Sequence, residues 1–330
     1  MSDPFQPLDL SGYWNANTDN VKAEDGFLWH APMDDQNQTP LRGLPGGSSR
    51  FWGVPFELAD REAESSVHSF VQVAAGTGGA LPDSVKIEIG AKAERLLFAH
   101  LCASVSGGPT IEGTGEDIGC YRITFEDGTV LEQKLRRRFE IHDVAVPWGH
   151  HPFLCRPCSE FLSVPIDDRS MPYGQAQVGV SSNSSDLEGW WLYDWENPSS
   201  EKKIESIEVC SSGTTPVLLG AITLCQETGD PFAWPPREDV ALSIDCDSED
   251  SVVVEMTRGV VARQDSLFVP DEEFTTTEET GWGRGGQTVK KGQYLEIHGS
   301  PEGTLEIRAG EAKKGSVRWG DVLENKAASD

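Results

Sequence analysis

An Asp-Gly pair, Asp127-Gly128, separates two runs in which apolar and polar residues alternate. Asp-Gly between such runs is a strong β-hairpin signal, because both residues tolerate a positive φ. Short β-rich runs recur along the chain, and residues 85–89 and 204–209 alternate with a period of two, which places one strand face in a core. No run has a strong amphipathic helical pattern. The sequence therefore predicts an all-β fold: an antiparallel β-sandwich or jelly roll followed by a smaller β-sandwich.

Turn clusters set the expected domain boundaries. The run GLPGG ends at Gly47, and a second cluster consists of Pro231, Pro235 and Pro236. Trp14 and Trp29 make the first segment too apolar for a free tail. We expect an N-terminal arm (1–44) packed on the first domain, a jelly-roll domain (45–235), a small β-sandwich domain (236–324) and a frayed polar tail (325–330).

The charge balance narrows the choice of partners. The chain has 54 acidic and 27 basic residues and a formal net charge of -27, which repels phosphate backbones and anionic membranes, so neither nucleic acid nor a membrane is an expected partner. No apolar run approaches the roughly 18 residues of a membrane helix, and the first residues lack a signal-peptide pattern. We therefore expect a cytoplasmic protein with mostly reduced cysteines. None of these sequence features indicates an oligomeric state.

Histidines and cysteines gather after the predicted hairpin. Imidazole and thiolate are zinc ligands, and a Cys-x2-Cys pair can place two sulfurs on one ion. The alternative is a packed crossover loop, because Pro157 lies inside the pair and Phe153-Leu154 is apolar. The candidate metal ligands are His142, His150, His151, Cys155 and Cys158. The carboxylates Glu140 and Asp143 lie beside them and, with His142, are the candidate catalytic residues, whereas His100 is expected to be a core histidine.

Two further runs are candidate ligand contacts. In a strand, Arg136 and Arg138 would share one face and could clamp a carboxylate such as a uronate, although salt bridges to nearby acidic residues are the simpler explanation. Trp191, Tyr193 and Trp195 would also share a strand face. Exposed rings on that face could stack on a sugar, whereas in a sandwich one face of every strand packs in the core.

Four runs carry a family resemblance: RFWGVPFEL, RLLFAHLCA, YRITFEDGTVLEQKLRRRFEI and WWLYDWENPSSEKKIESIEV. Their order resembles the galactose-binding-like jelly roll. RRRFEI followed by PWGHHPFL, with Trp-Glu-Asn-Pro at 195–198, is similar to the β-rich N-terminal region of CehA/McbA-like metallohydrolases. That family carries its chemistry in a downstream PHP-type domain, whose His-x-His motif does not occur in this chain. The resemblance therefore implies an accessory β region with a link to sugars or glycosides, and it transfers no catalytic residue.

The sequence leaves binding, catalysis and a structural role in assembly open. The first hypothesis is an accessory protein that recognises a carbohydrate or glycoside and supports a partner enzyme. The alternative is a metal-assisted glycoside hydrolase or lyase, with a divalent metal such as zinc held by His142, His150 and His151 and a nearby carboxylate or histidine as base. No nucleophile elbow, phosphate loop or dinucleotide fingerprint favours another chemistry.

Overall fold

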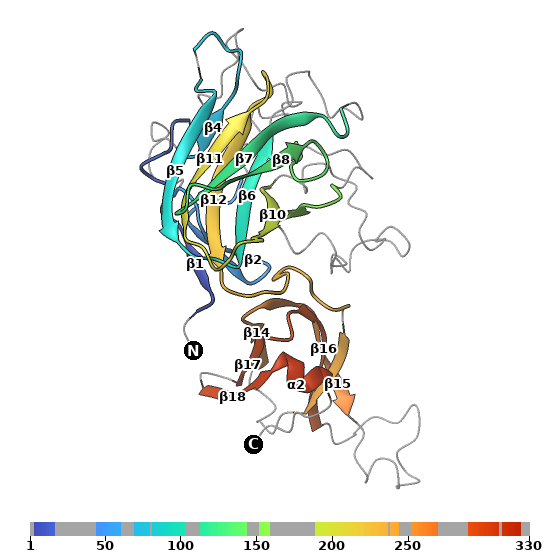
Figure 1. Ribbon diagram of the computed structural model, residues 1–330. Helices are drawn as coiled ribbons and strands as arrows, with labels where there is room; N and C mark the ends of the chain where they lie inside the picture. The colour runs from blue at the N-terminus through green and yellow to red at the C-terminus, as the bar shows by residue number, and fades with distance from the viewer. Residues whose placement is uncertain are drawn as a thin grey trace, which may run out of the picture. The chain divides into compact units, whose positions relative to one another are not determined.

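The computed structural model describes residues 3–16, 44–60, 69–79, 81–102, 113–143, 152–158, 189–236, 238–243, 252–269, 290–309 and 312–324. Over these residues the regular secondary structure is almost all β-strand, arranged in antiparallel sheets, which confirms the predicted all-β sandwich class. The described residues up to Asp230 form one compact unit, and those from Pro231 form a second (Figure 1).

The first unit contains a six-stranded sheet. Along its path it runs β1 (Phe5–Pro7), β12 (Val217–Cys225), β6 (Arg95–Cys102), β10 (Trp191–Glu196) and β9 (Arg156–Pro157), and β4 (Val71–Val73) pairs with another part of β12. β1 belongs to the N-terminal segment, for which the sequence predicts no strand. It forms because the short run Phe5–Pro7 completes the edge of β12, in register with Thr223 to Cys225.

A four-stranded sheet lies opposite. Its order is β5 (Ser84–Ala91), β11 (Ile204–Ser211), β7 (Asp117–Phe125) and β8 (Val130–Arg136). Strands β7 and β8 form the hairpin that the Asp-Gly pair predicts. Gly128 has a φ of 82° and its amide donates to the carbonyl of Phe125 at 2.8 Å, which closes the turn.

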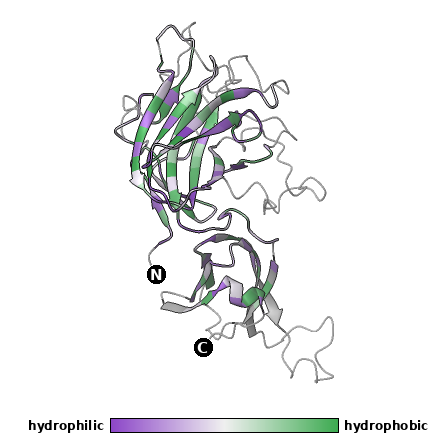
Figure 2. Ribbon diagram, in the orientation of Figure 1, coloured by the Kyte–Doolittle hydropathy of each residue, from purple (hydrophilic) through white to green (hydrophobic). Residues whose placement is uncertain are grey.

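Aromatic stacking joins the two sheets. The ring of Phe98 on β6 stacks on that of Tyr121 on β7, with centroids 4.1 Å apart and planes 9° apart. Every residue of β6 and β12 is buried, so both faces of these central strands are covered. Figure 2 shows the same strands as mostly hydrophobic along their length. Strands of this kind read as continuous apolar runs rather than as alternating ones.

A β-hairpin covers part of the outer face of the six-stranded sheet. Thr223 of β12 donates through Oγ1 to the carbonyl of Pro55 at 2.6 Å, which fixes the hairpin there. It consists of β2 (Ser48–Phe51) and β3 (Val54–Glu57), whereas the sequence predicts a single run broken by Pro55. Trp52 and Gly53 turn the chain with φ of 53° and 74°. A two-residue turn of type I′ has positive φ at both positions, and Trp is not a residue that predicts such a turn.

The second unit contains two three-stranded sheets. One has the order β13 (Glu238–Ser243), β16 (Lys290–Gly299), β15 (Gly259–Val269), and the other β14 (Val252–Met256), β17 (Thr304–Ala309), β18 (Ala312–Arg318), with the short helix α2 (Trp319–Leu323) at the end. Both sheets and α2 contribute to one core, which includes Ile297, Ile307 and Trp319. No helix in the described part of the chain has the length and apolar character needed to cross a membrane.

Candidate ligand surface beside a buried polar cluster

The chain turns sharply where β8 ends. Arg138 has a φ of 66°, and its amide donates to the carbonyl of Ile141 at 2.7 Å. The amide of Phe139 donates back to the carbonyl of Arg136 at 2.9 Å. Because the strand ends at Arg136, the expectation that Arg136 and Arg138 share one strand face is wrong. The two side chains leave a tight turn, which we call the 136–141 turn.

Arg136 is already paired with a carboxylate of its own turn. Glu140 accepts hydrogen bonds from the Arg136 main-chain amide at 2.9 Å and from its Nε at 3.1 Å. The Glu140 side chain is buried, and the Arg136 guanidinium lies 4.6 Å from the centroid of the Phe139 ring. The nearby Glu140 carboxylate also raises the pKa of Arg136. The simpler of the two sequence explanations, a salt bridge, is therefore the one seen for Arg136.

Arg137 points the other way and holds a buried ion pair. Its Nη1 donates to both carboxylate oxygens of Asp143, at 2.8 and 2.6 Å, and its Nε donates to Glu116 at 3.0 Å. Burial acts to raise the pKa of Asp143, but His142 and the Arg137 guanidinium outweigh it, so this pKa is lowered and the carboxylate stays ionised. Both charged groups of the pair are buried.

The His142 side chain is buried against Trp191. Its ring stacks on Trp191, with centroids 5.5 Å apart, and its Nδ1 accepts the main-chain N–H of Asp143 at 2.8 Å. The indole Nε1 of Trp191 donates to the main-chain carbonyl of Asp143 at 2.7 Å. The three catalytic candidates, Glu140, His142 and Asp143, therefore lie close together in the chain. All are buried, with contacts that fix their orientation.

His100 is a satisfied core histidine, as the sequence predicts. Its Nε2 lies 2.8 Å from the main-chain carbonyl of Glu140 and its Nδ1 lies 2.6 Å from the hydroxyl of Tyr121. A carbonyl can only accept, so Nε2 carries the proton and Nδ1 accepts the hydroxyl hydrogen. Burial lowers the pKa of His100 to about 3, so the ring is neutral at pH 7.

This lowered pKa predicts acid sensitivity. Below about pH 6.5 the unfolded chain takes up the His100 proton and the folded chain does not, so stability falls as the pH drops from about 6.5 toward 3. The slope for one group is at most about 1.4 kcal/mol per pH unit. His100→Gln keeps one donor and one acceptor but does not titrate. Urea midpoints measured from pH 7 to pH 4 should fall less steeply for this variant, and parallel curves would contradict the assignment.

The aromatic strand faces the sandwich interior. Trp191, Tyr193 and Trp195 do share one face, but Trp191 is 1% exposed, and Tyr193 stacks over His100 with centroids 6.0 Å apart. The expected platform on which a sugar could stack is therefore not available on this face, because the four-stranded sheet covers it. Burial also raises the pKa of the Tyr193 hydroxyl.

The metal-binding prediction is only partly covered by the structure. Cys155 and Cys158 are buried beside β10, and the amide of Cys158 donates to the carbonyl of Trp190 at 2.9 Å. His150 and His151 lie outside the described residues. Within the described ranges no three His, Cys, Asp or Glu side chains are grouped to hold a metal ion. The zinc site stays a prediction.

An exposed aromatic surface lies beside the 136–141 turn. The side chain of Phe153 is 61% exposed and that of Leu154 is 52% exposed, although the sequence suggests that both pack into a crossover loop. The Phe153 ring lies 5.1 Å from that of Phe139, and the Arg138 guanidinium lies 5.1 Å from the Phe153 centroid. We call Phe139, Phe153 and Leu154, with Arg136 and Arg138, the Phe153 patch.

Main-chain hydrogen bonds hold this patch in place. The amide of Phe153 donates to the carbonyl of Arg138 at 2.9 Å, and the amide of Cys155 donates to that of Phe139 at 3.0 Å. The exposed ring is thus attached to a turn that the buried Glu140 carboxylate also fixes. The only sequence signal for the patch is Phe-Leu between Pro152 and Cys155, which does not distinguish a buried pair from an exposed one.

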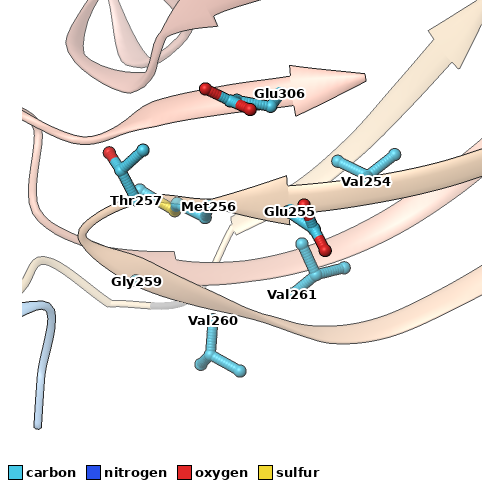
Figure 3. A pocket seen from close by; sticks show the side chains of 8 residues that line it. All are labelled: Val254, Glu255, Met256, Thr257, Gly259, Val260, Val261 and Glu306. Atoms are coloured by element: carbon cyan, nitrogen blue, oxygen red, sulfur yellow. The ribbon is translucent and has the colours of Figure 1, made fainter. Parts of the chain in front are cut away.

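The second unit has an open groove of about 520 Å³ that no sequence pattern suggests. It lies at the turn between β14 and β15, beside β17, and Figure 3 shows Glu255 and Glu306 on neighbouring strands. Arg308 pairs with Glu255 at 2.6 Å. The groove is lined by Val254, Glu255, Met256, Thr257, Gly259, Val260, Val261 and Glu306.

Comparison with known proteins adds little. No protein-family model matches the chain, and no curated protein matches it. Among solved structures, the catalytic domain of a GH87 alpha-1,3-glucanase (D1069A, in complex with nigerose) is 14% identical, with a TM-score of 0.22. The match covers 51% of this chain and 24% of that chain. A likeness this weak does not support any assignment of function.

Proposed function

We propose that the first unit is a carbohydrate- or glycoside-binding module and that the Phe153 patch is its ligand surface. The observation that carries the proposal is the Phe153 ring, which is 61% exposed although it is a large apolar side chain. In this role the protein holds a glycan and supports a partner enzyme that acts on it.

The chemistry of the patch suits a sugar ring. One face of a pyranose presents C–H groups, which pack on a flat apolar ring, while hydroxyl groups around the rim form hydrogen bonds. Phe153 and Leu154 supply the apolar surface. The guanidinium groups of Arg136 and Arg138 lie over the two aromatic rings. Arg136 is paired with Glu140, so the Arg138 guanidinium beside Phe153 is the group we propose for a ligand carboxylate, and an acidic saccharide then fits the patch better than a neutral one.

The patch is preorganised, which reduces the entropy lost on binding. Its two segments are joined by main-chain hydrogen bonds, from Phe153 to Arg138 and from Leu154 to Phe139, at 2.9 and 3.2 Å. Groups that are fixed before the ligand arrives lose less freedom when it binds. A rigid aromatic anchor of this kind is the usual centre of a binding surface.

Calorimetric titration with neutral and uronate-containing oligosaccharides tests the proposal. We expect binding by the natural chain, stronger for the uronates, and a loss of at least about tenfold in affinity for Phe153→Ala, equivalent to about 1.4 kcal/mol. Val130→Ala is the matched control, because Val130 is also an exposed apolar residue of this unit and lies outside the patch. Absence of binding across the panel, or equal affinities for Phe153→Ala and Val130→Ala, would refute the proposal.

A further inference from the structure

Two cysteines face each other across the centre of the four-stranded sheet. Cys120 on β7 and Cys210 on β11 are direct partners in the register. Residues directly opposite in an antiparallel pair point to the same face. Their neighbours Tyr121 and Val209 form the adjacent pair and are fully buried between the sheets, so the two thiols lie on the opposite face of the sheet, where both cysteines are also largely buried.

The backbone spacing of this pair suits a disulfide. The amide of Ser212 donates to the carbonyl of Ile118 at 2.9 Å, so Ser212 and Ile118 are a hydrogen-bonded pair. Such pairs recur at every second residue of an antiparallel ladder. Cys210 and Cys120, two residues away on each strand, are therefore also a hydrogen-bonded pair. Hydrogen-bonded antiparallel pairs have Cα atoms about 5.5 Å apart. Disulfides span Cα distances of roughly 4.4–6.8 Å. The Cα spacing of this register is therefore within the range that a disulfide spans.

The thiols also contact each other and a cation. The pKa of Cys120 is raised, mainly by burial, although a hydrogen bond with the Cys210 side chain and the charge of Arg122 partly offset this. Burial and the neighbouring Cys120 raise the pKa of Cys210 to about 12. Cys120 is also the direct register partner of Lys134 on β8, and we therefore assign it as the attacking thiol. The charged groups around the pair on this face are Arg122, Glu132, Lys134, Asp117 and Glu208.

We infer that Cys120 and Cys210 form a reversible dithiol–disulfide site that links β7 to β11. With oxidised glutathione, the Cys120 thiolate attacks one glutathione sulfur and releases one reduced glutathione. The Cys210 thiol then gives up its proton and attacks the Cys120 sulfur, which releases the second. The protein dithiol is oxidised to a disulfide and one glutathione disulfide is reduced to two thiols, so atoms and electrons balance.

Mass spectrometry after treatment with oxidised glutathione tests this inference. We expect the folded full-length chain to lose two hydrogen atoms, to keep no glutathione, and to regain both hydrogens with dithiothreitol. Cleavage after Glu116 and Glu126 isolates Cys120 on its own peptide, while cleavage after Glu208 and Glu227 leaves Cys210 with Cys225. The Cys225→Ser variant should therefore form the same cross-link, which identifies Cys210 as the partner.

The Cys210→Ser variant gives the complementary result. Without its partner thiol, Cys120 should retain one glutathione as a mixed disulfide. Three outcomes would overturn the inference: a Cys120 cross-link to a different cysteine, a stable glutathione adduct on Cys120 in the natural chain, or an unmodified Cys120 under conditions that oxidise the urea-unfolded chain. The test is independent of the Phe153 patch.

Discussion

Replacing Arg137 with alanine is expected to lower the free energy of unfolding of the first unit by about 3–5 kcal/mol. The guanidinium group is buried and donates to both oxygens of the buried Asp143 carboxylate, at 2.8 and 2.6 Å. Removing it leaves that carboxylate without its counter-charge in a region where water is excluded. The loss can be measured by urea denaturation, followed by tryptophan fluorescence.

Arg122→Ala is the matched control for this experiment. Arg122 also pairs with two carboxylates, Glu132 and Glu208, each at 3.4 Å, but its side chain is half exposed. Exposed ion pairs contribute about 0–1 kcal/mol. If Arg137→Ala and Arg122→Ala reduce stability equally, the Arg137–Asp143 pair is not the buried interaction described above.

Trp191→Ala is the second substitution with a large expected effect, a loss of about 3–5 kcal/mol in the free energy of unfolding. The indole is 1% exposed, stacks on His142, and donates to the carbonyl of Asp143. Its removal opens a cavity and leaves that carbonyl without this donor. Urea denaturation of the purified variant gives the measurement, and circular dichroism establishes whether it folds.

Phe153→Ala provides the contrast for Trp191→Ala. An exposed side chain contributes little to stability, so this variant should unfold within about 0.5 kcal/mol of the natural chain. An exposed ligand platform at Trp191 would give the opposite pattern, with a small loss of stability for Trp191→Ala and a large loss for Phe153→Ala. That pattern would contradict the packing of β10 described above.

Sequence patterns predicted those parts of the fold that depend on the conformations allowed to the residues of a single turn. The Asp127-Gly128 hairpin was predictable because Gly128 adopts the positive φ that the turn needs. Trp52 and Arg138 also have positive φ, although neither residue type often adopts it. Contacts with the surrounding structure, rather than the local sequence, therefore stabilise these two turns. This explains why the β2–β3 hairpin and the early end of β8 were missed.

The candidate site was harder to predict, because alternation identifies two faces but not which one is covered. Trp191 and Tyr193 share a face as expected, yet that face packs against the second sheet. Conversely, Phe153 resembles a core residue in sequence and is exposed. Burial of this kind depends on contacts between segments far apart in the chain, such as Trp191 with Asp143.

Hydrogen exchange with and without a bound oligosaccharide tests the central claim most directly. A saccharide on the Phe153 patch should slow exchange in peptides that cover 136–141 and 152–155, and it should leave the groove at β14 and β15 unchanged. Slower exchange at β14 and β15 alone, with no change at Phe153, would contradict the claim and place the ligand in the second unit.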